Sequence, residues 1–289
     1  MGKPHISFAL LALLLLITAF YAVAQNNVSD AQTGFALSRM ETAINASQEE
    51  FTMRDIYFLG RAAAAHLLNH FPMYTENPVI TDYLNLICNT LAINSPIPNW
   101  YDGYYVMILD TPVINAFATP GGHIFLTRGI LDLVTSEDML AAIIAHEMAH
   151  IQLQHGVAVI LHSNLVQNLN QEQRRINQSL ESGTQQQLFS AAVGEFVQSL
   201  FSGGYSQLQE FEADSTAFSL LASAGYNPAN LLELLRILGT LQGDQRGSLN
   251  STHPLPAQRI GNLQGMMNAY RGADNSDARR DRFWRGMGR

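Results

Sequence analysis

The first apolar block of the chain stands at its N-terminus. Lys3 precedes an apolar run from Ile6 to Tyr21, and Ala22-Val23-Ala24 forms a small-x-small cleavage site before Gln25. This order is that of a secretory signal peptide. An uncleaved anchor is the alternative, because the run approaches the roughly 20 apolar residues that span a bilayer. The cleavage site favours removal, so we expect residues 1–24 to be a signal peptide.

Most of the remaining chain shows helical periodicity. Apolar side chains recur at helical spacing in several stretches, and turn residues such as Asn77-Pro78 stand at their borders. The helices expected from this pattern cover residues 34–70, 79–94, 138–154, 157–201, 205–224, 228–241 and a last stretch that runs to residue 270. The middle of the fourth stretch, residues 167–187, is polar, and we expect it to be an exposed excursion, either helical or a mobile loop; whether it serves as a lid is open.

Strand-like patterns occur only before the third of these helices. Tyr104–Leu109, Val113–Ala118 and His123–Thr127 are rich in β-branched and aromatic residues, and turns at Asp102-Gly103 and Pro120–Gly122 separate them. We therefore expect a small three-stranded sheet followed by a central helix. The predicted fold class is α+β, mainly helical.

The central helix carries the strongest chemical signal. Its sequence His146-Glu147-Met148-Ala149-His150 places two imidazoles four residues apart, on one helix face and one turn apart. Zn²⁺ accepts neutral imidazole nitrogens in a tetrahedral shell, and the Glu147 carboxylate lies where it can take a proton from an attacking water. We expect a capping box from Thr135 and Asp138 at its start and Gly156 to end it. Such a pattern also arises by chance on core helices, so a further ligand is needed.

A third ligand is offered by Glu210, and Asp214 lies four residues later on the same helix face. If Glu210 binds the metal, Asp214 can accept a hydrogen bond from a ligand histidine and fix its tautomer. The alternative is that both acids lie on the exposed side of an amphipathic helix.

Other candidate residues are weaker. His66 and His70 are also four residues apart, but no glutamate stands in the position of a base, so we expect a structural or surface pair. His123 on a strand is expected to be a surface or cross-strand residue. Cys88, the one cysteine, lies in an apolar segment and is expected to be buried and unreactive.

Composition narrows the function class. Loss of the signal peptide removes Lys3 and no acid, so the formal charge changes from −8 to −9 over the remaining 265 residues. An acidic chain of this kind is a poor candidate for binding nucleic acid, or for binding a membrane through a polybasic segment. With one cysteine the chain builds no internal disulfide, so its stability must come from its core.

Four motifs in one order resemble the M48 family of zinc metallopeptidases, which includes the HtpX, Ste24 and Oma1 types. They are Asn115–Ala118 with Gly121-Gly122, the His-Glu-x-x-His motif, Glu210 to Asp214, and Thr252-His253-Pro254. The exported branch typified by the BepA and LoiP proteases is the most similar. The resemblance covers about Met53 to Tyr270 and implies a zincin (gluzincin) domain over residues 25–270.

The resemblance also implies roles for the motif residues. His146, His150 and Glu210 correspond to the ligands of one Zn²⁺ per chain, and Glu147 corresponds to the general base. His253 is implied to lie near the metal, where it stabilises the oxyanion or occupies the open position and keeps the enzyme latent. Arg259 matches the basic residue that ends the family's histidine–proline motif and is expected to form an ion pair.

The expected function is hydrolysis of peptide bonds in misfolded or unassembled exported proteins. The hairpin from Ile114 to Thr127, with Asn115, Ala116, Phe117, Gly121 and Gly122, is expected to provide an edge strand to which a peptide adds. Two alternatives stay open: a zinc-holding, chaperone-like module that does not cut, or a hydrolase of cell-wall peptides. We expect a periplasmic location; peripheral association with the outer membrane is left open, and the oligomeric state is not predicted.

Three further expectations concern departures from the family and the end of the chain. Ser206-Gln207 stands where the family commonly has Ser-Arg, so an arginine contact near the site is expected to be missing. No C-terminal array of helical repeats of the BepA type follows the domain. Residues 271–289 hold six Arg and three Asp with little apolar content, and we expect a disordered tail.

Overall fold

A computed structural model describes residues 52–162, 197–198, 204–241, 252–253, 256–272 and 276–288. The signal peptide predicted for residues 1–24, the first part of the helix predicted from residue 34 and the polar stretch 167–187 lie outside these residues. Every helix within the described parts of the chain falls short of the length and apolarity that crossing a bilayer requires.

Two helices precede the sheet, as predicted. Helix α3 covers Met53–His70 and α4 covers Pro78–Ile93. The Asn77 side chain accepts a hydrogen bond from the Val79 backbone N–H, and proline occupies the first turn, where no backbone donor is needed. The Asn77-Pro78 pair therefore starts α4 as the sequence indicated.

The predicted three-stranded sheet is confirmed. Strands β1 (Tyr105–Leu109), β2 (Ala116–Ala118) and β3 (His123–Thr127) lie in the order β1-β3-β2. β1 runs parallel to β3, and β2 pairs with β3 as an antiparallel hairpin. β2 therefore lies at one edge of this sheet.

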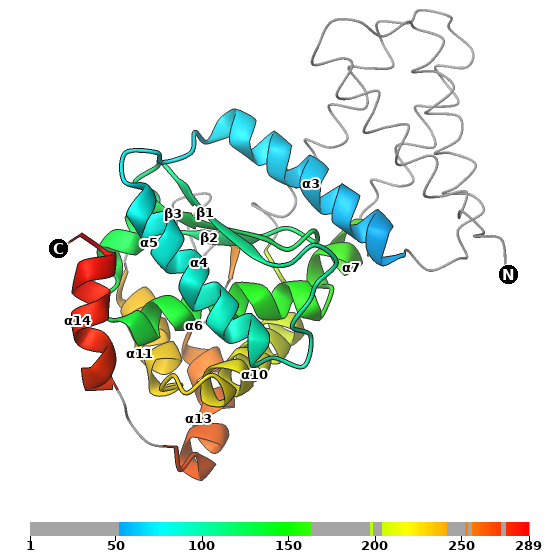
Figure 1. Cartoon of the computed structure of the whole chain (residues 1–289). Helices are drawn as coiled ribbons and strands as arrows, with labels where there is room; N and C mark the ends of the chain where they lie inside the picture. Colours follow the sequence, from blue (N-terminus) through cyan, green and yellow to red (C-terminus); the bar gives the residue numbers. More distant parts are fainter. Residues whose placement is uncertain are drawn as a thin grey trace, which may run out of the picture.

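The sheet is covered on both faces, and its side chains alternate accordingly. Helix α3 lies across one face and helices α4 and α6 lie on the other (Figure 1). Phe117, Phe125 and Leu109 pack with α3, whereas the residues between them face the main core. This alternation is the two-residue period of a strand buried on both sides.

α3 approaches the hairpin closely at a pair of glycines. A β-carbon on Gly60 would lie 1.9 Å from the backbone nitrogen of Gly121, and one on Gly121 would lie 2.8 Å from the Tyr57 carbonyl oxygen. No larger side chain fits between these two backbones. The turn that joins β2 to β3 is therefore held under α3.

The central helix α6 covers Glu137–Gln152, after a short helix α5 (Arg128–Leu133). Its N-cap is Ser136, whose hydroxyl accepts a hydrogen bond from the Met139 N–H, so the predicted capping box from Thr135 and Asp138 is wrong. All but its last residue are buried. This position makes α6 the core element that the sequence predicted.

The end of α6 also differs from the prediction. The chain reverses at Gln154, which adopts a left-handed conformation with φ of 56°, and α7 (His155–His162) begins at the next residue. Gly156 is therefore the second residue of α7 and not the stop. A glutamine in this conformation carries a steric cost that glycine avoids.

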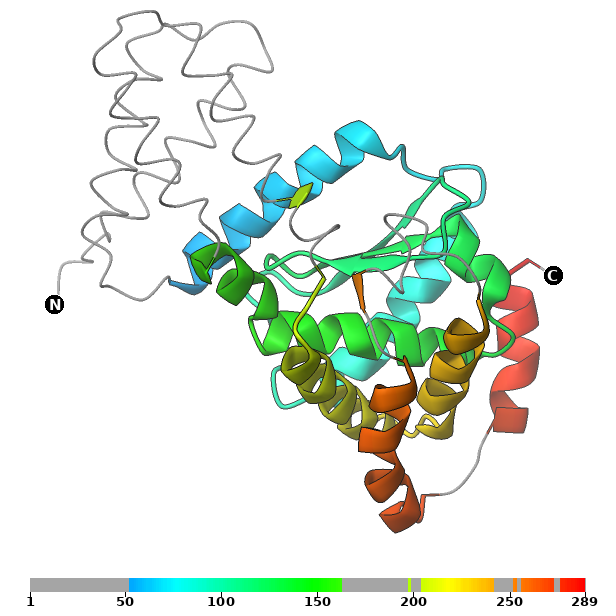
Figure 2. The same ribbon diagram turned by 180° about the vertical axis from the view of Figure 1, so that it is seen from behind.

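Three helices complete the side of the molecule shown in Figure 2: α10 (Gln207–Ser223), α11 (Ala229–Thr240) and α13 (Pro256–Ala269). α10 makes the most extensive contact with α6. Ser206 and Gln209 form a complete capping box at its N-terminus. The three helices correspond to the predicted stretches 205–224, 228–241 and the last one.

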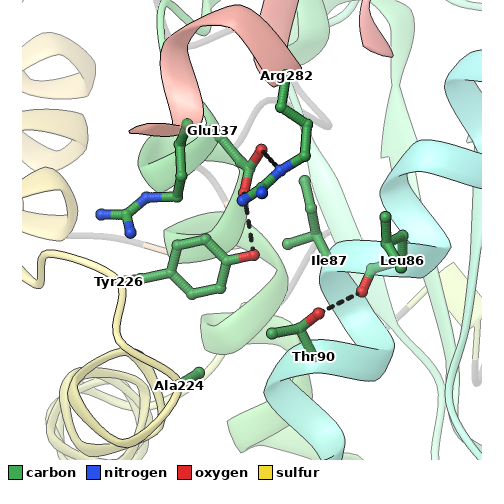
Figure 3. Close-up of a pocket in the computed structure, with 8 residues that line it drawn as sticks. Leu86, Ile87, Thr90, Glu137, Ala224, Tyr226 and Arg282 are labelled. Carbon is green, nitrogen blue, oxygen red and sulfur yellow. Dashed lines mark hydrogen bonds and ion pairs between the residues drawn. The ribbon is translucent and has the colours of Figure 1, made fainter. Parts of the chain in front are cut away.

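The predicted disorder of residues 271–289 is wrong for Ser276–Gly286, which form helix α14. Phe283 is 1% exposed, and Arg279 makes two hydrogen bonds to the buried carboxylate of Asp138, at 2.9 and 2.6 Å. Arg282 and Tyr226 both point to Glu137 (Figure 3). The order of this polar segment comes from partners about 140 residues away, which local composition does not reveal.

Candidate metal centre

Helix α6 places the two motif histidines together. The Nε2 atoms of His146 and His150 lie 3.0 Å apart, and the two ring centroids are 4.6 Å apart. Both side chains are buried. This is the geometry that a four-residue spacing on one helix face predicts.

Two further donors reach this pair from other parts of the chain. Glu210, in the first turn of α10, is fully buried, and His253 follows Thr252 in a short segment before α13. One ligand atom from each of His146, His150, Glu210 and His253 lies within 4.8 Å of every other. In the described residues, no other group of three or more potential ligands is this compact.

The separations of these donors fit a small tetrahedral cation. Metal–ligand distances near 2.0–2.1 Å place neighbouring donors about 3.3 Å apart in a tetrahedral shell. The observed values are 3.0 Å (His146 Nε2 to His150 Nε2), 3.3 Å (His146 Nε2 to His253 Nδ1), 2.9 Å (His253 Nδ1 to Glu210 Oε1) and 3.6 Å (His146 Nε2 to Glu210 Oε2 and His150 Nε2 to Glu210 Oε1). Three imidazoles and one carboxylate are a donor set that suits Zn²⁺.

An ion-pair network supports the carboxylates around the site. Arg259 donates to both oxygens of Asp214, at 2.8 and 2.7 Å, and its Nη1 lies 2.9 Å from Glu210 Oε2. Burial opposes ionisation of Glu210, but the charges of His253 and Arg259 outweigh it and hold the pKa of Glu210 well below its ordinary value. The ion pair expected for Arg259 is present.

Asp214 lies where the sequence predicted, beside a motif histidine. Its Oδ1 is 3.1 Å from His146 Nδ1, the ring nitrogen that does not face the other donors. Burial and the Arg259 charge lower the pKa of His146, but hydrogen bonds to Asp214 and Glu210 outweigh them and raise it to about 9. Asp214 thus fixes the orientation of His146, with Nε2 directed at the cluster.

Glu147 differs from Glu210 and Asp214 because, within the described residues, it forms no ion pair with an arginine. The side chain is 1% exposed, Oε1 lies 3.6 Å from His253 Nε2, and Oε2 has no hydrogen bond to the described residues. Desolvation raises the pKa of this carboxyl. A buried, unpaired carboxylate oxygen beside a metal cluster has the position and basicity that proton transfer from a water molecule requires.

Hydrogen bonds hold the segment that carries His253 to its neighbours. The Tyr205 N–H donates to the Thr252 carbonyl oxygen, and the Thr252 hydroxyl donates to Asn115 Oδ1 at 3.3 Å. Asn115 immediately precedes the edge strand β2. The predicted site residues on the hairpin, α6 and the 252–253 segment therefore meet in one region.

The other members of the predicted edge strand are buried. Ala116 and Phe117 belong to β2, whereas Gly121 and Gly122 lie in the turn beneath α3 and beside Gly103. The close backbone contacts at Gly121 and Gly122 leave no room for a side chain, so packing is sufficient to explain glycine at both positions. β2 is one of the two edge strands of this sheet, and its three residues are buried.

The weaker candidates lie away from the cluster. His66 and His70 are neighbours on α3, with their Nε2 atoms 3.1 Å apart, and His123 contacts Thr119. Cys88 is buried, and burial raises the pKa of its thiol to about 12, as expected of an unreactive core residue. Gln207, at the position where an arginine was expected to be missing, hydrogen-bonds to Gln258 on the surface.

A pocket of about 270 Å³ lies at the opposite end of α6 from the metal cluster. Leu86, Ile87 and Thr90 of α4 form one wall, and Tyr226 and Arg282 lie opposite (Figure 3). None of the candidate site residues lines it. The pocket belongs to the packing of α14 and not to the metal centre.

Sequence reasoning gave no role to two residues that contact the cluster. Tyr205 stacks on the His150 ring, with centroids 3.9 Å apart and planes 17° apart, and His155 Nδ1 lies 2.9 Å from His150 Nδ1. His155 is five residues after His150, a spacing that does not bring side chains together in one helix. The reversal at Gln154 creates this contact.

Comparison with known proteins gives one consistent result. Residues 80–267 match the model of peptidase family M48. The chain is 31% identical over 159 residues to Metalloprotease LoiP of Escherichia coli, and 32% identical over 157 residues to Mitochondrial metalloendopeptidase OMA1 of Arabidopsis thaliana. These alignments cover 54% and 53% of this chain, and 60% and 30% of the relatives. Beta-barrel assembly-enhancing protease of Escherichia coli is 22% identical over 240 residues, which are 77% of this chain and 45% of that protein.

Proposed function

Because the chain belongs to peptidase family M48, we propose that it is a zinc-dependent endopeptidase that hydrolyses peptide bonds in misfolded or unassembled proteins of the cell envelope. The proposal is carried by the cluster of His146, His150, Glu210 and His253 next to the unpartnered carboxylate oxygen of Glu147. A purely structural metal site does not require a buried carboxylate beside the ligands.

The ligands in this proposal are His146, His150 and Glu210. A zinc ion held by them would polarise the scissile carbonyl and acidify the attacking water. Asp214 orients His146, and Arg259 keeps Asp214 and Glu210 ionised. These contacts fix the donor geometry before substrate arrives.

Glu147 is the general base in this proposal. Its free Oε2 accepts the proton of the attacking water, and the same carboxyl then delivers the proton to the leaving amine. Desolvation raises the pKa of Glu147 and so strengthens it as a base. In this proposal the substrate binds as an extended peptide along the edge strand β2.

His253 is proposed to hold the fourth position in the resting enzyme. Its Nδ1 is 3.3 Å from His146 Nε2 and 2.9 Å from Glu210 Oε1, within the spacing of the other donors. Substrate would have to displace this imidazole, which could then donate a hydrogen bond to the developing oxyanion. The resting form is therefore latent.

The proposed location is the periplasm, after removal of residues 1–24. The charge pattern and cleavage site at the N-terminus support export. One relative is named a β-barrel assembly-enhancing protease, and its name supports the proposal that the substrates are polypeptides of the envelope. Peripheral association with the outer membrane is part of the same proposal. The acidic composition supports no role for nucleic acid.

The first test compares the zinc-loaded chain with Glu147→Gln on casein. We expect the native chain to cleave casein and the variant to keep one zinc per chain and lose cleavage by at least about a hundredfold, because the general base is absent. Zinc content measured on both samples is the control. Cleavage by Glu147→Gln at the native rate would contradict the mechanism.

A second test separates latency from a binding role without cleavage. We expect His253→Ala to retain zinc and to change the rate of cleavage, because one donor leaves the cluster while three remain. Loss of zinc in this variant would make His253 an essential ligand. A zinc-loaded His253→Ala chain that cuts neither casein nor cell-wall peptides would favour the chaperone-like alternative, and cutting of wall peptides alone would favour the wall hydrolase.

A further inference from the structure

A second histidine lies directly behind His150. His155 is 4% exposed, and its Nδ1 lies 2.9 Å from His150 Nδ1, the nitrogen on the far side of that ring from the metal donors. Its other nitrogen, Nε2, lies 3.3 Å from Glu212 Oε2. Glu212 comes from α10 and its side chain is 50% exposed. The three side chains form a line from the metal cluster to solvent.

The break between α6 and α7 makes this line possible. In a continuous helix, residues five positions apart point about 140° away from each other, given 3.6 residues per turn. Here Leu153 caps α6, Gln154 turns the chain with a positive φ, and His155 starts the next helix facing back toward His150. The left-handed conformation of Gln154 thus has a consequence for the metal centre.

The protons on this line have one consistent arrangement. His150 Nε2 faces His146 Nε2 at 3.0 Å, so a neutral His150 that ligates through Nε2 carries its proton on Nδ1. That proton is donated to His155 Nδ1, which leaves the His155 proton on Nε2, where it is donated to the Glu212 carboxylate. In neutral His155 the two hydrogen bonds depend on one tautomer, since Nδ1 can accept from His150 only when the His155 proton is on Nε2.

The two ligand histidines are therefore supported in different ways. His146 Nδ1 contacts a carboxylate directly, the fully buried Asp214. On its Nδ1 side, His150 reaches a carboxylate through His155, and that carboxylate is half-exposed. The stacked ring of Tyr205 further restricts rotation of His150.

We propose that His155 and Glu212 are positioning residues that fix the tautomer and ring orientation of His150 and so set the affinity of the site for zinc. The inference rests on the proposed function, in which His150 is a ligand. It assigns a role to two residues that the metal-binding motifs do not include. Hydrogen-bond partners of ligand histidines typically contribute about 10- to 100-fold to metal affinity.

The experiment measures zinc affinity by competition with a chromogenic chelator, on the full chain and four variants. His155→Leu removes the acceptor for His150, and we expect zinc to bind about 10- to 100-fold more weakly. His155→Asn places an amide oxygen near the position of Nδ1, and we expect it to restore affinity to within about threefold of the native chain. Glu212→Ala is expected to weaken binding at least threefold, and the matched control Glu233→Ala, an exposed acid on α11, is expected to change nothing.

The visible spectrum of the cobalt-loaded chain gives a second readout that does not depend on activity. We expect its bands to shift in His155→Leu and to return in His155→Asn. A folded His155→Leu or Glu212→Ala chain that binds zinc as tightly as the native chain would overturn the relay. If His155→Leu does not fold, Glu212→Ala decides alone, because its side chain is half-exposed. Failure of the native chain to bind zinc would instead overturn the proposed function.

Discussion

The buried charges near the metal cluster are matched residue by residue. Arg259, which is 3% exposed, forms ion pairs with Asp214 and Glu210. Both acids are 0% exposed. An unpaired charge at such depth would cost several kcal/mol. Among the described residues, Glu147 is the exception, since it faces His253 at 3.6 Å and forms no ion pair with an arginine. This contrast is consistent with the proposed role of Glu147 in proton transfer.

The pKa of His123, a residue outside the cluster, shows how partial burial affects a single ionisable side chain. Burial and the nearby charge of Arg61 lower its pKa to about 4, from an unfolded value near 6.5. The folded state therefore favours neutral His123, and its contribution to stability is present above about pH 6.5 and is lost as the pH falls toward 4. The loss is at most about 3–4 kcal/mol, the value for a shift of about 2.5 pH units.

We expect His123→Gln to lose less stability than the native chain between pH 7 and pH 4.5, because glutamine does not titrate. Urea denaturation of both chains at each pH measures the difference. Other groups titrate in both chains and cancel in the comparison. Parallel stability curves for the two chains would show that His123 is not buried as described.

Helix boundaries in this protein decide which side chains meet. α6 ends at Gln152, and the single left-handed residue Gln154 allows α7 to begin with His155 packed on His150. At the other end, Ser136 caps α6 and also donates a hydrogen bond to Asn230 in the first turn of α11. The element that carries the metal motif is thus fixed at both ends by specific contacts.

Replacement of Gln154 by glycine tests the cost of that reversal. Left-handed backbone costs a non-glycine residue about 1–2 kcal/mol, part of which is offset by the greater freedom of glycine in the unfolded chain. We expect Gln154→Gly to raise the free energy of unfolding by about 0.5–1 kcal/mol. Urea denaturation measures it.

The matched control is Gln264→Gly, at an exposed position inside α13. There glycine interrupts a regular helix, and we expect a loss of about 0.5–1 kcal/mol. Loss of stability in both variants would argue against a left-handed residue at position 154.

Over the whole molecule, α6 joins two sites that lie at its opposite ends. Its C-terminal half carries two of the four candidate metal ligands, His146 and His150, and its first turn carries the buried acids Glu137 and Asp138. The positive end of the helix dipole stabilises these two carboxylates. Because they are buried, cationic partners are also required to offset the cost of removing their charges from water. α14 supplies them as Arg282 and Arg279.

We expect loss of the α14 contact to destabilise the whole domain. Phe283 is 1% exposed and belongs to the main core, so Phe283→Ala should cost about 3–5 kcal/mol. Arg280→Ala, on the exposed side of the same helix, should cost less than about 0.5 kcal/mol. Thermal unfolding followed by circular dichroism compares them. Equal small effects would mean that α14 does not pack on the core.

Much of the fold and of the site follows from local sequence. The three strands, the helical periodicity of α4, α6 and α10, and Asn77-Pro78 as a helix start were all readable without the structure. So was the proximity of His146 and His150, because residues four apart on a helix share a face. Local spacing also placed Glu210 and Asp214 on one face of α10.

The remaining features depend on contacts between distant parts of the chain. The sequence suggested a cap at Thr135 and a stop at Gly156, and it gave no signal for His155 or Glu212 as neighbours of His150. It also indicated disorder where α14 forms, because a segment with few apolar residues has little local reason to fold.

The physical reason is the same in each case. Local sequence sets backbone preference and the face on which a side chain lies, and both are properties of a few neighbouring residues. Partners for buried charges, the exact residue at which a helix ends and the support of a ligand histidine depend on which surfaces pack together. The sequence by itself therefore determined the metal-binding motif and the elements that bear it, and packing determined how the donors meet and what holds them.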